Sequence, residues 1–280
     1  MKLINFLHEG RQSFGIVEND IVIDLGGEIE GVNSVDQTLA EPQWLSMARD
    51  QSTLSIPLAA ITFLPPVLNP RLMAMVGLNY ASHIAETGRE PPKYPSIFTR
   101  CTDSVVGHLA PLIRPRVSEK FDYEGELAIV IGKGGRHIAK EDAYEHVAGY
   151  TLFNDGSVRD YQRHTIQFFP GKNFWRSGSV GPWIVTRDEA PAPAEMTLTT
   201  RLNGAVMQQA RLDDLVFGVP ELISYLSDVL PLVPGDIIAT GTPGGVGAFR
   251  EPPVWMKPGD RVEVEVCGIG TLVNMIVDEE

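Results

Sequence analysis

Short runs of alternating or continuous apolar residues dominate the chain and predict a mainly β protein. Residues 13–25 predict two short strands around a turn at 18–20, and a polar, weakly helical stretch follows to about residue 53. Longer strands are expected at 72–77, 126–131, 148–153, 183–186, 197–203, 235–240, 261–267 and 271–277, and helices at 80–87, 140–147 and 220–230. Because strands do not alternate regularly with helices, we expect an α+β fold with a mixed sheet and a few covering helices.

Prolines in close succession mark a boundary in the first quarter of the chain. Pro65, Pro66 and Pro70 lie in the stretch "FLPPVLNPR". Proline lacks a backbone N–H and fixes its φ angle, so neither a helix nor a paired strand continues through this stretch. The sequence therefore predicts a small β-containing N-terminal domain at 1–66 and a larger domain at 67–280.

The stretch "FDYEGELAIVI" at residues 121–131 places three carboxylates at the start of an apolar run, at Asp122, Glu124 and Glu126. After Glu126 both strand faces are apolar, which is typical of a strand covered on two sides. Side chains alternate along a strand, so the three carboxylates share one face that leads into a core. Gly125 leaves the opposite face without a side chain, which allows close packing or a bulge.

A second Glu-x-Glu pair in the sequence provides a comparison. In "RVEVEVC" at 261–267, Glu263 and Glu265 alternate with valines. This alternation predicts a half-buried hairpin strand whose glutamates point to water. We expect no chemistry there.

The charges of the acidic strand require a partner. Two like charges about 5 Å apart repel by roughly 3 kcal/mol at an effective dielectric near 20. The strand-like run 149–155 ends in a further carboxylate, Asp155. Carboxylate ligands without histidine or cysteine predict a hard-cation site that binds Mg²⁺, Mn²⁺ or Ca²⁺.

The segment "GLNYASHIAETG" at 77–88 places a histidine and a glutamate one helical turn apart. Asn79 is expected to cap this short helix and Gly88 to end it. His83 and Glu86 then lie on one helical face, where the carboxylate can orient the imidazole as a general base requires. A surface ion pair without catalysis is the alternative interpretation.

Residues 156–176 follow the third carboxylate and bring Arg159, Gln162 and Lys172. Each can stabilise an oxyanion or bind a carboxylate. The alternatives are that Arg159 pairs only with Asp160 and that Lys172 is an ordinary loop lysine.

The glycine-rich segment "PGDIIATGTPGGVGAF" at 234–249 lacks the spacing of a phosphate loop or a dinucleotide-binding turn, which excludes nucleotide binding of those kinds. Backbone amides around Thr242 can bind a carboxylate instead.

Composition and charge narrow the classes of function. The 280-residue chain has a formal net charge of −13 and a pI of about 4.9, which disfavours nucleic acids and anionic membrane surfaces as partners. Two cysteines make no disulfide framework. No apolar run approaches the roughly 20 residues needed to cross a bilayer, and the start of the chain does not resemble a signal peptide. These features predict a soluble, cytoplasmic protein.

Together the motifs resemble the fumarylacetoacetate hydrolase family over about residues 70–270. The matching segments, in the family's order, are "GLNYASHIAE", "FDYEGELAIVIGKGGRHI", "AGYTLFNDGSVRDYQ", "GK" at 171–172, "GPWIVT" and "PGDIIATGTPGGVG". The resemblance implies a mixed β-roll that assembles as a homodimer. It also implies roles for individual residues: metal ligation for Glu124, Glu126 and Asp155, catalysis for His83, Glu86 and Lys172, and substrate contact for Arg159, Gln162 and Thr242.

The activity that this resemblance implies is divalent-metal-dependent hydrolysis of a carbon–carbon bond in an acylpyruvate, giving pyruvate and a carboxylic acid. His83, held by Glu86, would activate water, and Lys172 would stabilise the oxyanion. An isomerase or decarboxylase of a 2-oxo diacid that works through a metal-bound enolate is one alternative. A non-catalytic binder of a metal and a 2-oxo acid is another.

One stretch departs from the family pattern. After the lysine the chain reads "KNFWRSGSVGPW", which introduces Trp175 and Arg176 where the family commonly has Ser-Phe-Asp-Thr-Phe. We expect Arg176 to face the distal end of the substrate and to favour an anionic or hydroxylated tail.

Overall fold

The computed structural model describes residues 1–41, 43–88 and 90–280. Twelve strands form one large mixed sheet in which the central order is β4-β3-β2-β1-β14-β12-β11-β17-β6-β7, with β5 beside β1 and β8 beside β14. The strands of this sheet are β1 Lys2–His8, β2 Arg11–Glu18, β3 Ile21–Asp24, β4 Ser55–Pro57, β5 Thr62–Phe63, β6 Met73–Gly77, β7 Ser96–Thr99, β8 Val105–Val106, β11 Gly125–Ile131, β12 Val147–Asn154, β14 Gly178–Thr186 and β17 Ile237–Ala239.

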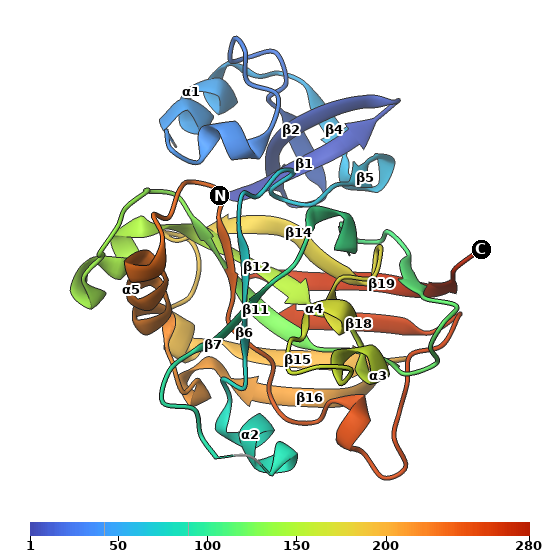
Figure 1. Ribbon diagram of the computed structural model, residues 1–280. Helices are drawn as coiled ribbons and strands as arrows, with labels where there is room; N and C mark the ends of the chain where they lie inside the picture. Colours follow the sequence, from blue (N-terminus) through green and yellow to red (C-terminus); the bar gives the residue numbers. More distant parts are fainter. Residues whose placement is uncertain (42, 89) are drawn as a thin grey trace.

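A second sheet of five strands packs against the large one (Figure 1). Its order is β16-β15-β18-β19-β9, and the strands are β9 Leu112–Arg114, β15 Thr197–Leu202, β16 Ala205–Arg211, β18 Arg261–Val266 and β19 Gly270–Asp278. A two-stranded pair, β10 Phe121–Asp122 and β13 Ser157–Val158, lies beside the two sheets. The mainly β fold with two packed sheets confirms the predicted fold class.

Helices are few and short. The α-helices are α1 Gln43–Gln51, α2 Ala81–Thr87, α3 Arg159–Gln162, α4 Phe169–Lys172 and α5 Val219–Val229. The 3₁₀-helices cover Val35–Thr38, Leu58–Ala60, Thr102–Ser104, Lys140–His146, Pro193–Glu195, Leu212–Asp214 and Gly247–Phe249. The helix expected at 140–147 is therefore a 3₁₀-helix. In the described chain no helix has both the length and the apolar character needed to span a bilayer.

Strand β11 is the centre of the core because both of its faces are buried. Leu127 and Ile129 contact the cluster that includes Leu198 and Val264 of the second sheet, whereas Ala128 and Val130 contact a cluster built by the N-terminal elements. All seven residues of β11 are buried. The prediction of a strand covered on two sides is confirmed, and it explains why residues 127–131 carry no polar alternation.

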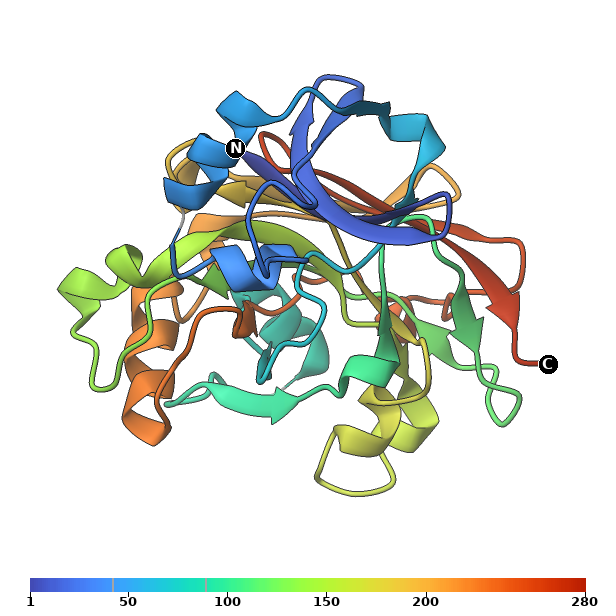
Figure 2. The same ribbon diagram turned by 90° about the horizontal axis from the view of Figure 1, so that it is seen from above.

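The N-terminal region continues the large sheet. β1 pairs antiparallel with β14, with Leu3 opposite Ile184, so the sheet runs from the first residues into the centre of the molecule. The N-terminal elements, drawn in blue, lie over one side of the fold (Figures 1 and 2). The proline-rich stretch near residue 66 thus lies between parts of the chain that share a sheet and a core cluster.

Candidate active site

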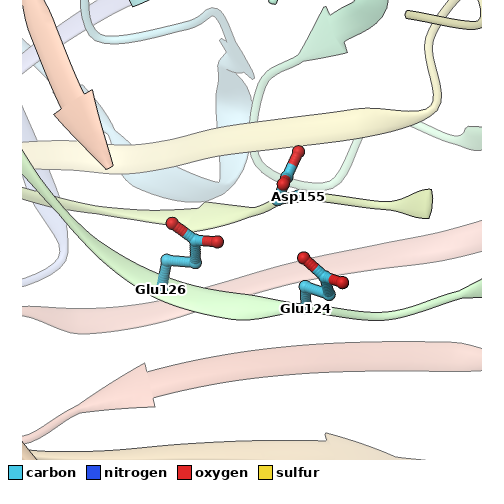
Figure 3. A group of neighbouring side chains, drawn as sticks. All are labelled: Glu124, Glu126 and Asp155. Carbon is cyan, nitrogen blue, oxygen red and sulfur yellow. The ribbon is translucent and has the colours of Figure 1, made fainter. Parts of the chain in front are cut away.

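Three buried carboxylates, Glu124, Glu126 and Asp155, meet where β11 begins and β12 ends. Ligand oxygens of the three lie within 4.8 Å of one another. Figure 3 shows Glu124 and Glu126 rising from the same side of one strand and Asp155 facing them from its neighbour. Two-residue alternation places the glutamates on one face, and the antiparallel pairing of β11 with β12 brings the aspartate opposite them. The amide of Asp155 donates a 2.8 Å hydrogen bond to the carbonyl of Glu124.

Gly125 between the two glutamates fits a close approach of the second sheet. A Cβ added at this position would lie 2.1 Å from Oγ1 of Thr200 in β15 and 3.1 Å from Cγ1 of Val264 in β18. Such contacts are too short for any side chain, so glycine is required. The close packing expected from the sequence is present, and it fixes the strand segment that carries the carboxylates.

Buried cations surround two of the three carboxylates. Nζ of Lys172 lies 2.6 Å from Oε2 of Glu124 and also contacts Oδ2 of Asp155, and the guanidinium of Arg159 contacts Oε1 of Glu124. Nη1 of Arg100 donates to Oδ1 of Asp155 at 2.7 Å. Burial alone would raise the pKa of Glu124, but the charges of Arg159 and Lys172 outweigh it and lower this pKa to about 2.

Arg159 also contacts Asp122, the first carboxylate of the acidic segment. Nε of Arg159 donates to Asp122 at 2.7 Å, and the amides of Tyr123, Gly247 and Ala248 donate to the same carboxylate. With both oxygens hydrogen-bonded, Asp122 holds Arg159 in place and lies outside the group of three carboxylates. The pairing of Arg159 with Asp160 that the sequence allowed does not form.

Glu126, alone of the three carboxylates, forms no ion pair with the residues that the structure describes. It accepts a 2.8 Å hydrogen bond from the amide of Gly241. Burial and the neighbouring charges of Asp155 and Glu124 raise its pKa well above the usual range. Four buried carboxylates, with Asp122 included, therefore face three buried cations, Arg100, Arg159 and Lys172.

This arrangement fits a hard divalent cation. The donor set is three carboxylates, the ligands that Mg²⁺, Mn²⁺ and Ca²⁺ prefer. Each carboxylate can accept about four hydrogen bonds or ligand contacts, so the ion pairs to Lys172 and Arg159 leave acceptor capacity free. An added cation would offset the excess negative charge at Glu126. Glu124, Glu126 and Asp155 are the residues that would hold it.

Helix α2 brings the predicted histidine–glutamate pair to the same cavity. Nδ1 of His83 lies 2.7 Å from Oε1 of Glu86, and Oε2 of Glu86 accepts from the amide of Gly245. The glutamate therefore fixes the ring through Nδ1 and leaves Nε2 as the nitrogen that can exchange a proton with a bound molecule. Gly88 ends the helix with φ of 67°, as predicted.

The predicted cap of α2 is wrong. Tyr80, and not Asn79, stands at the N-cap, and no side chain caps the helix. The amide of Asn79 bonds instead to the backbone of Phe217 and Thr240. Asn79 thus ties the start of α2 to two distant segments.

A cavity of about 610 Å³ joins the carboxylates to solvent. Its lining includes eight residues that the sequence nominated: His83, Glu124, Glu126, Asp155, Arg159, Gln162, Lys172 and Thr242. Oε1 of Gln162 accepts from Arg159, which leaves its amide N–H groups free to donate. The hydroxyl of Thr242 donates to the carbonyl of Gly125 and accepts from Gln208, so this side chain also braces the acidic strand.

The structure does not bring Arg176 to this cavity. Its guanidinium lies over the ring of Trp175, 5.4 Å from the centroid, and it is absent from the described lining residues. Its φ angle of 54° is in the left-handed region. The expectation that Arg176 faces the substrate therefore has no support in the fold.

Several residues that surround the site were not predicted from the sequence. Arg100 lies 55 residues before Asp155 and belongs to no recognisable motif, yet its side chain is buried and bonds to that ligand. Phe98 and Phe249 line the cavity, and the ring of Phe249 packs edge-on against His83 at 6.3 Å. Only the folded topology brings these residues to the carboxylates.

The comparison strand behaves as expected. β18 alternates between buried valines and partly exposed residues. Glu263 and Glu265 pair with Arg261 and Arg201 on the outer face of the sheet. Within the described part of the chain, neither glutamate lies in a group of three side chains that could bind a metal.

The fold and the site are those of a β-roll enzyme family whose members include tautomerases, isomerases and hydrolases. Residues 73–277 match the family described as fumarylacetoacetate (FAA) hydrolase C-terminal, and the chain belongs to the fumarylacetoacetate hydrolase family. The resemblance in the motifs is thereby confirmed.

Sequence similarity to oxaloacetate tautomerases extends over nearly the whole chain. The mitochondrial oxaloacetate tautomerase FAHD2A of Bos taurus is 39% identical over 266 residues, which covers 90% of this chain and 85% of the relative. The oxaloacetate tautomerase YisK of Bacillus subtilis is 38% identical over 261 residues, with 90% and 86% covered.

Solved structures agree on the fold. The fumarylacetoacetate hydrolase of Exiguobacterium antarcticum has a TM-score of 0.89 at 35% identity, with both chains fully covered. A maleylpyruvate hydrolase of Sphingobium, solved with manganese(II) and pyruvate, has a TM-score of 0.82 at 28% identity, again with both chains fully covered.

Proposed function

We propose that this protein is a divalent-metal-dependent tautomerase that interconverts the keto and enol forms of a 2-oxo dicarboxylic acid of the oxaloacetate type. The observation that carries the proposal is the cavity in which His83, held by Glu86, lies with Lys172 and the three carboxylates. The oxaloacetate tautomerases that match nine tenths of the chain support this activity over the acylpyruvate hydrolysis expected from the sequence.

The chemistry requires one proton to leave C3 of the substrate and one to reach the oxygen on C2. Nε2 of His83 is the free nitrogen of an imidazole fixed by Glu86, so it can accept the proton from C3 and deliver a proton to the C2 oxygen, with the reverse transfers in the direction from enol to keto. A divalent cation held by Glu124, Glu126 and Asp155 would supply Lewis acidity at the 2-oxo group. Mg²⁺ is our first choice, with Mn²⁺ or Ca²⁺ also suited to the ligands.

The remaining residues bind and orient the substrate. Nη2 of Arg159 is buried and has no hydrogen-bond partner among the described residues, so it can donate to the carboxylate next to the 2-oxo group. The ammonium of Lys172 can stabilise negative charge that develops on the C2 oxygen. Gln162 can donate a further hydrogen bond from its amide.

Hydrolysis of an acylpyruvate is the second candidate. It is favoured by the same 2.7 Å contact between His83 and Glu86, because a base oriented in this way can also deprotonate water. The two activities differ in products: tautomerisation breaks no carbon–carbon bond, whereas hydrolysis releases pyruvate and a second acid.

Product analysis separates these reactions. The purified protein is incubated with Mg²⁺ or Mn²⁺ and with enol-oxaloacetate, an acylpyruvate and an unsaturated 2-oxo diacid, and all products are identified. We expect faster conversion of enol to keto oxaloacetate, with loss of the rate on chelation and in Glu124→Gln. If only the acylpyruvate is converted, and gives pyruvate and a second acid, the protein is a hydrolase. Release of carbon dioxide would indicate a decarboxylase, and no turnover of any compound would indicate a binding protein.

The assembly and location predicted from the sequence stay predictions. We propose a homodimer, which light scattering on the purified protein measures directly. We also propose a cytoplasmic location, although the FAHD2A relative is mitochondrial.

A further inference from the structure

We infer that Arg163 binds the distal carboxylate of the substrate and makes the site selective for dicarboxylic 2-oxo acids. This inference rests on the proposed function and deepens it. Arg163 follows α3 directly, lines the 610 Å³ cavity and is exposed to solvent. Neither the family motifs nor their spacing predicts a role for Arg163.

The other cations of the cavity already form ion pairs with carboxylates of the protein, and of the Arg159 guanidinium only Nη2 is left for a ligand. Arg159 contacts Asp122 and Glu124, and Lys172 contacts Glu124 and Asp155. Arg163, by contrast, has no side-chain hydrogen bond or ion pair within residues 1–41, 43–88 and 90–280. A guanidinium offers five N–H donors in a fixed geometry that suits a carboxylate, so Arg163 is available for one.

The position of Arg163 suits the far end of a short diacid. Arg159 begins α3 in a buried position and Arg163 follows its last residue at the rim. Four residues of helix advance the chain by about 6 Å, and two long arginine side chains that begin this close together can contact the two carboxylates of one short diacid. A substrate with one carboxylate near Arg159 can therefore reach Arg163 with the other.

Aromatic contacts fix the segment that carries Arg163. The ring of Tyr161 packs edge-on against Phe174 at 5.0 Å, and Phe168 packs edge-on against Phe98 at 5.6 Å. The backbone N–H of Arg163 also bonds to the carbonyl of Asp160. The connection between α3 and α4 projects from the body of the fold in Figure 2, yet it is anchored on both sides of Arg163.

Charge balance agrees with a doubly charged ligand. The charged side chains of the lining are three carboxylates and three cations: Glu124, Glu126, Asp155, Arg159, Arg163 and Lys172. They cancel, so a bound divalent cation would leave two positive charges for the substrate. Without Arg163 only one would remain, which suits a monocarboxylate.

The test compares oxaloacetate with its 4-methyl ester, which keeps the enolisable 2-oxo acid and masks the distal charge. We expect Arg163→Gln to raise KM for oxaloacetate about tenfold, the loss typical of one charged hydrogen bond. Turnover of both compounds and KM for the ester should stay within about twofold of the wild type. Arg163→Lys keeps the charge and should lose less. An equal change for both compounds, or no change for either, overturns the inference.

Two further measurements separate this inference from its rivals. Arg176→Gln tests the arginine expected from the sequence: a selective loss for oxaloacetate in Arg176→Gln and none in Arg163→Gln overturns our assignment. Calorimetric binding of both compounds to the Mg²⁺-loaded protein needs no turnover. If the wild type turns over neither compound, the proposed function fails. In that case, a loss of affinity for the diacid in Arg163→Gln but not in Arg176→Gln still supports the carboxylate site at Arg163. Equal diacid affinity in Arg163→Gln and the wild type, or no binding by the wild type, overturns the inference.

Discussion

Replacing Glu126 with glutamine removes the carboxylate of the site that forms no ion pair in the described part of the chain. Its ligand oxygen lies within 4.8 Å of those of Glu124 and Asp155. Each such pair of like charges repels by about 3 kcal/mol at an effective dielectric near 20. Lys172, Arg159 and Arg100 offset part of this repulsion. We therefore expect Glu126→Gln to stabilise the metal-free protein by about 1 to 3 kcal/mol.

The same substitution should weaken metal binding. A cation that binds only the folded state at a hundred times its Kd adds about 2.7 kcal/mol to the free energy of unfolding. A neutral amide oxygen in place of a carboxylate should lower the affinity by about a hundredfold, since ligand charge sets affinity at such sites. At the same metal concentration the variant would then gain only about 0.4 kcal/mol.

Urea unfolding measures both effects. Wild type and Glu126→Gln are unfolded with chelator and again with Mn²⁺. The matched control is Glu265→Gln on β18, where a partly exposed glutamate pairs with Arg201. The control should change stability by less than about 1 kcal/mol and keep the full gain from metal. Our reasoning is refuted if Glu126→Gln destabilises the metal-free protein and still gains as much from Mn²⁺ as the wild type.

Three other predictions follow from the structure. Glu86→Gln should lower kcat by about 10- to 100-fold, and His83→Ala should lower it by about 10²- to 10⁴-fold. Circular dichroism should show that both variants are folded, and unchanged rates would remove the pair from the mechanism. Burial, followed by the charge of Arg261, lowers the pKa of His108 to about 4. The unfolded chain therefore binds more protons between about pH 6.5 and 4, and up to about 3 kcal/mol of stability is lost as pH falls through this window; His108→Asn should flatten the urea-measured profile, and an identical profile would contradict the assignment. Gly125→Ala should destabilise by about 1 to 3 kcal/mol through its contact with Thr200, and Thr200→Ala should restore part of that loss in the double variant.

Most strands of the core could be predicted because each buries a continuous or alternating apolar run, but β1 was missed although it lies between β2 and β14 in the large sheet. Edge elements could not. β16 has a single buried residue, Gln208, so its sequence shows no hydrophobic period, although it pairs along its length with β15. The short strands β8, β10 and β13 have two residues each, too few for any period to be visible.

Some residues of the site could likewise be predicted from the sequence and others could not. Glu124 and Glu126 are close in sequence, as are His83 and Glu86, so strand and helix periodicity alone places each pair on one face. Arg100 reaches Asp155 only through the tertiary fold. For Arg176 the sequence suggested a contact with the substrate that the fold does not support. The residue stands in an unusual stretch beside a motif, but its backbone is left-handed, its guanidinium lies over Trp175, and it is not among the described residues that line the cavity.

The central claim is that a divalent cation at Glu124, Glu126 and Asp155 supports the enolisation of a 2-oxo diacid. A titration of metal-free protein with Mn²⁺, in which bound metal and the rate of enol-oxaloacetate ketonisation are measured in the same samples, tests it most directly. We predict that the rate rises in proportion to bound metal and saturates at one ion per chain, and that Glu126→Gln needs about a hundredfold more Mn²⁺ to reach the same bound fraction. A full rate in the chelated protein, or a rate independent of bound metal, would contradict the account.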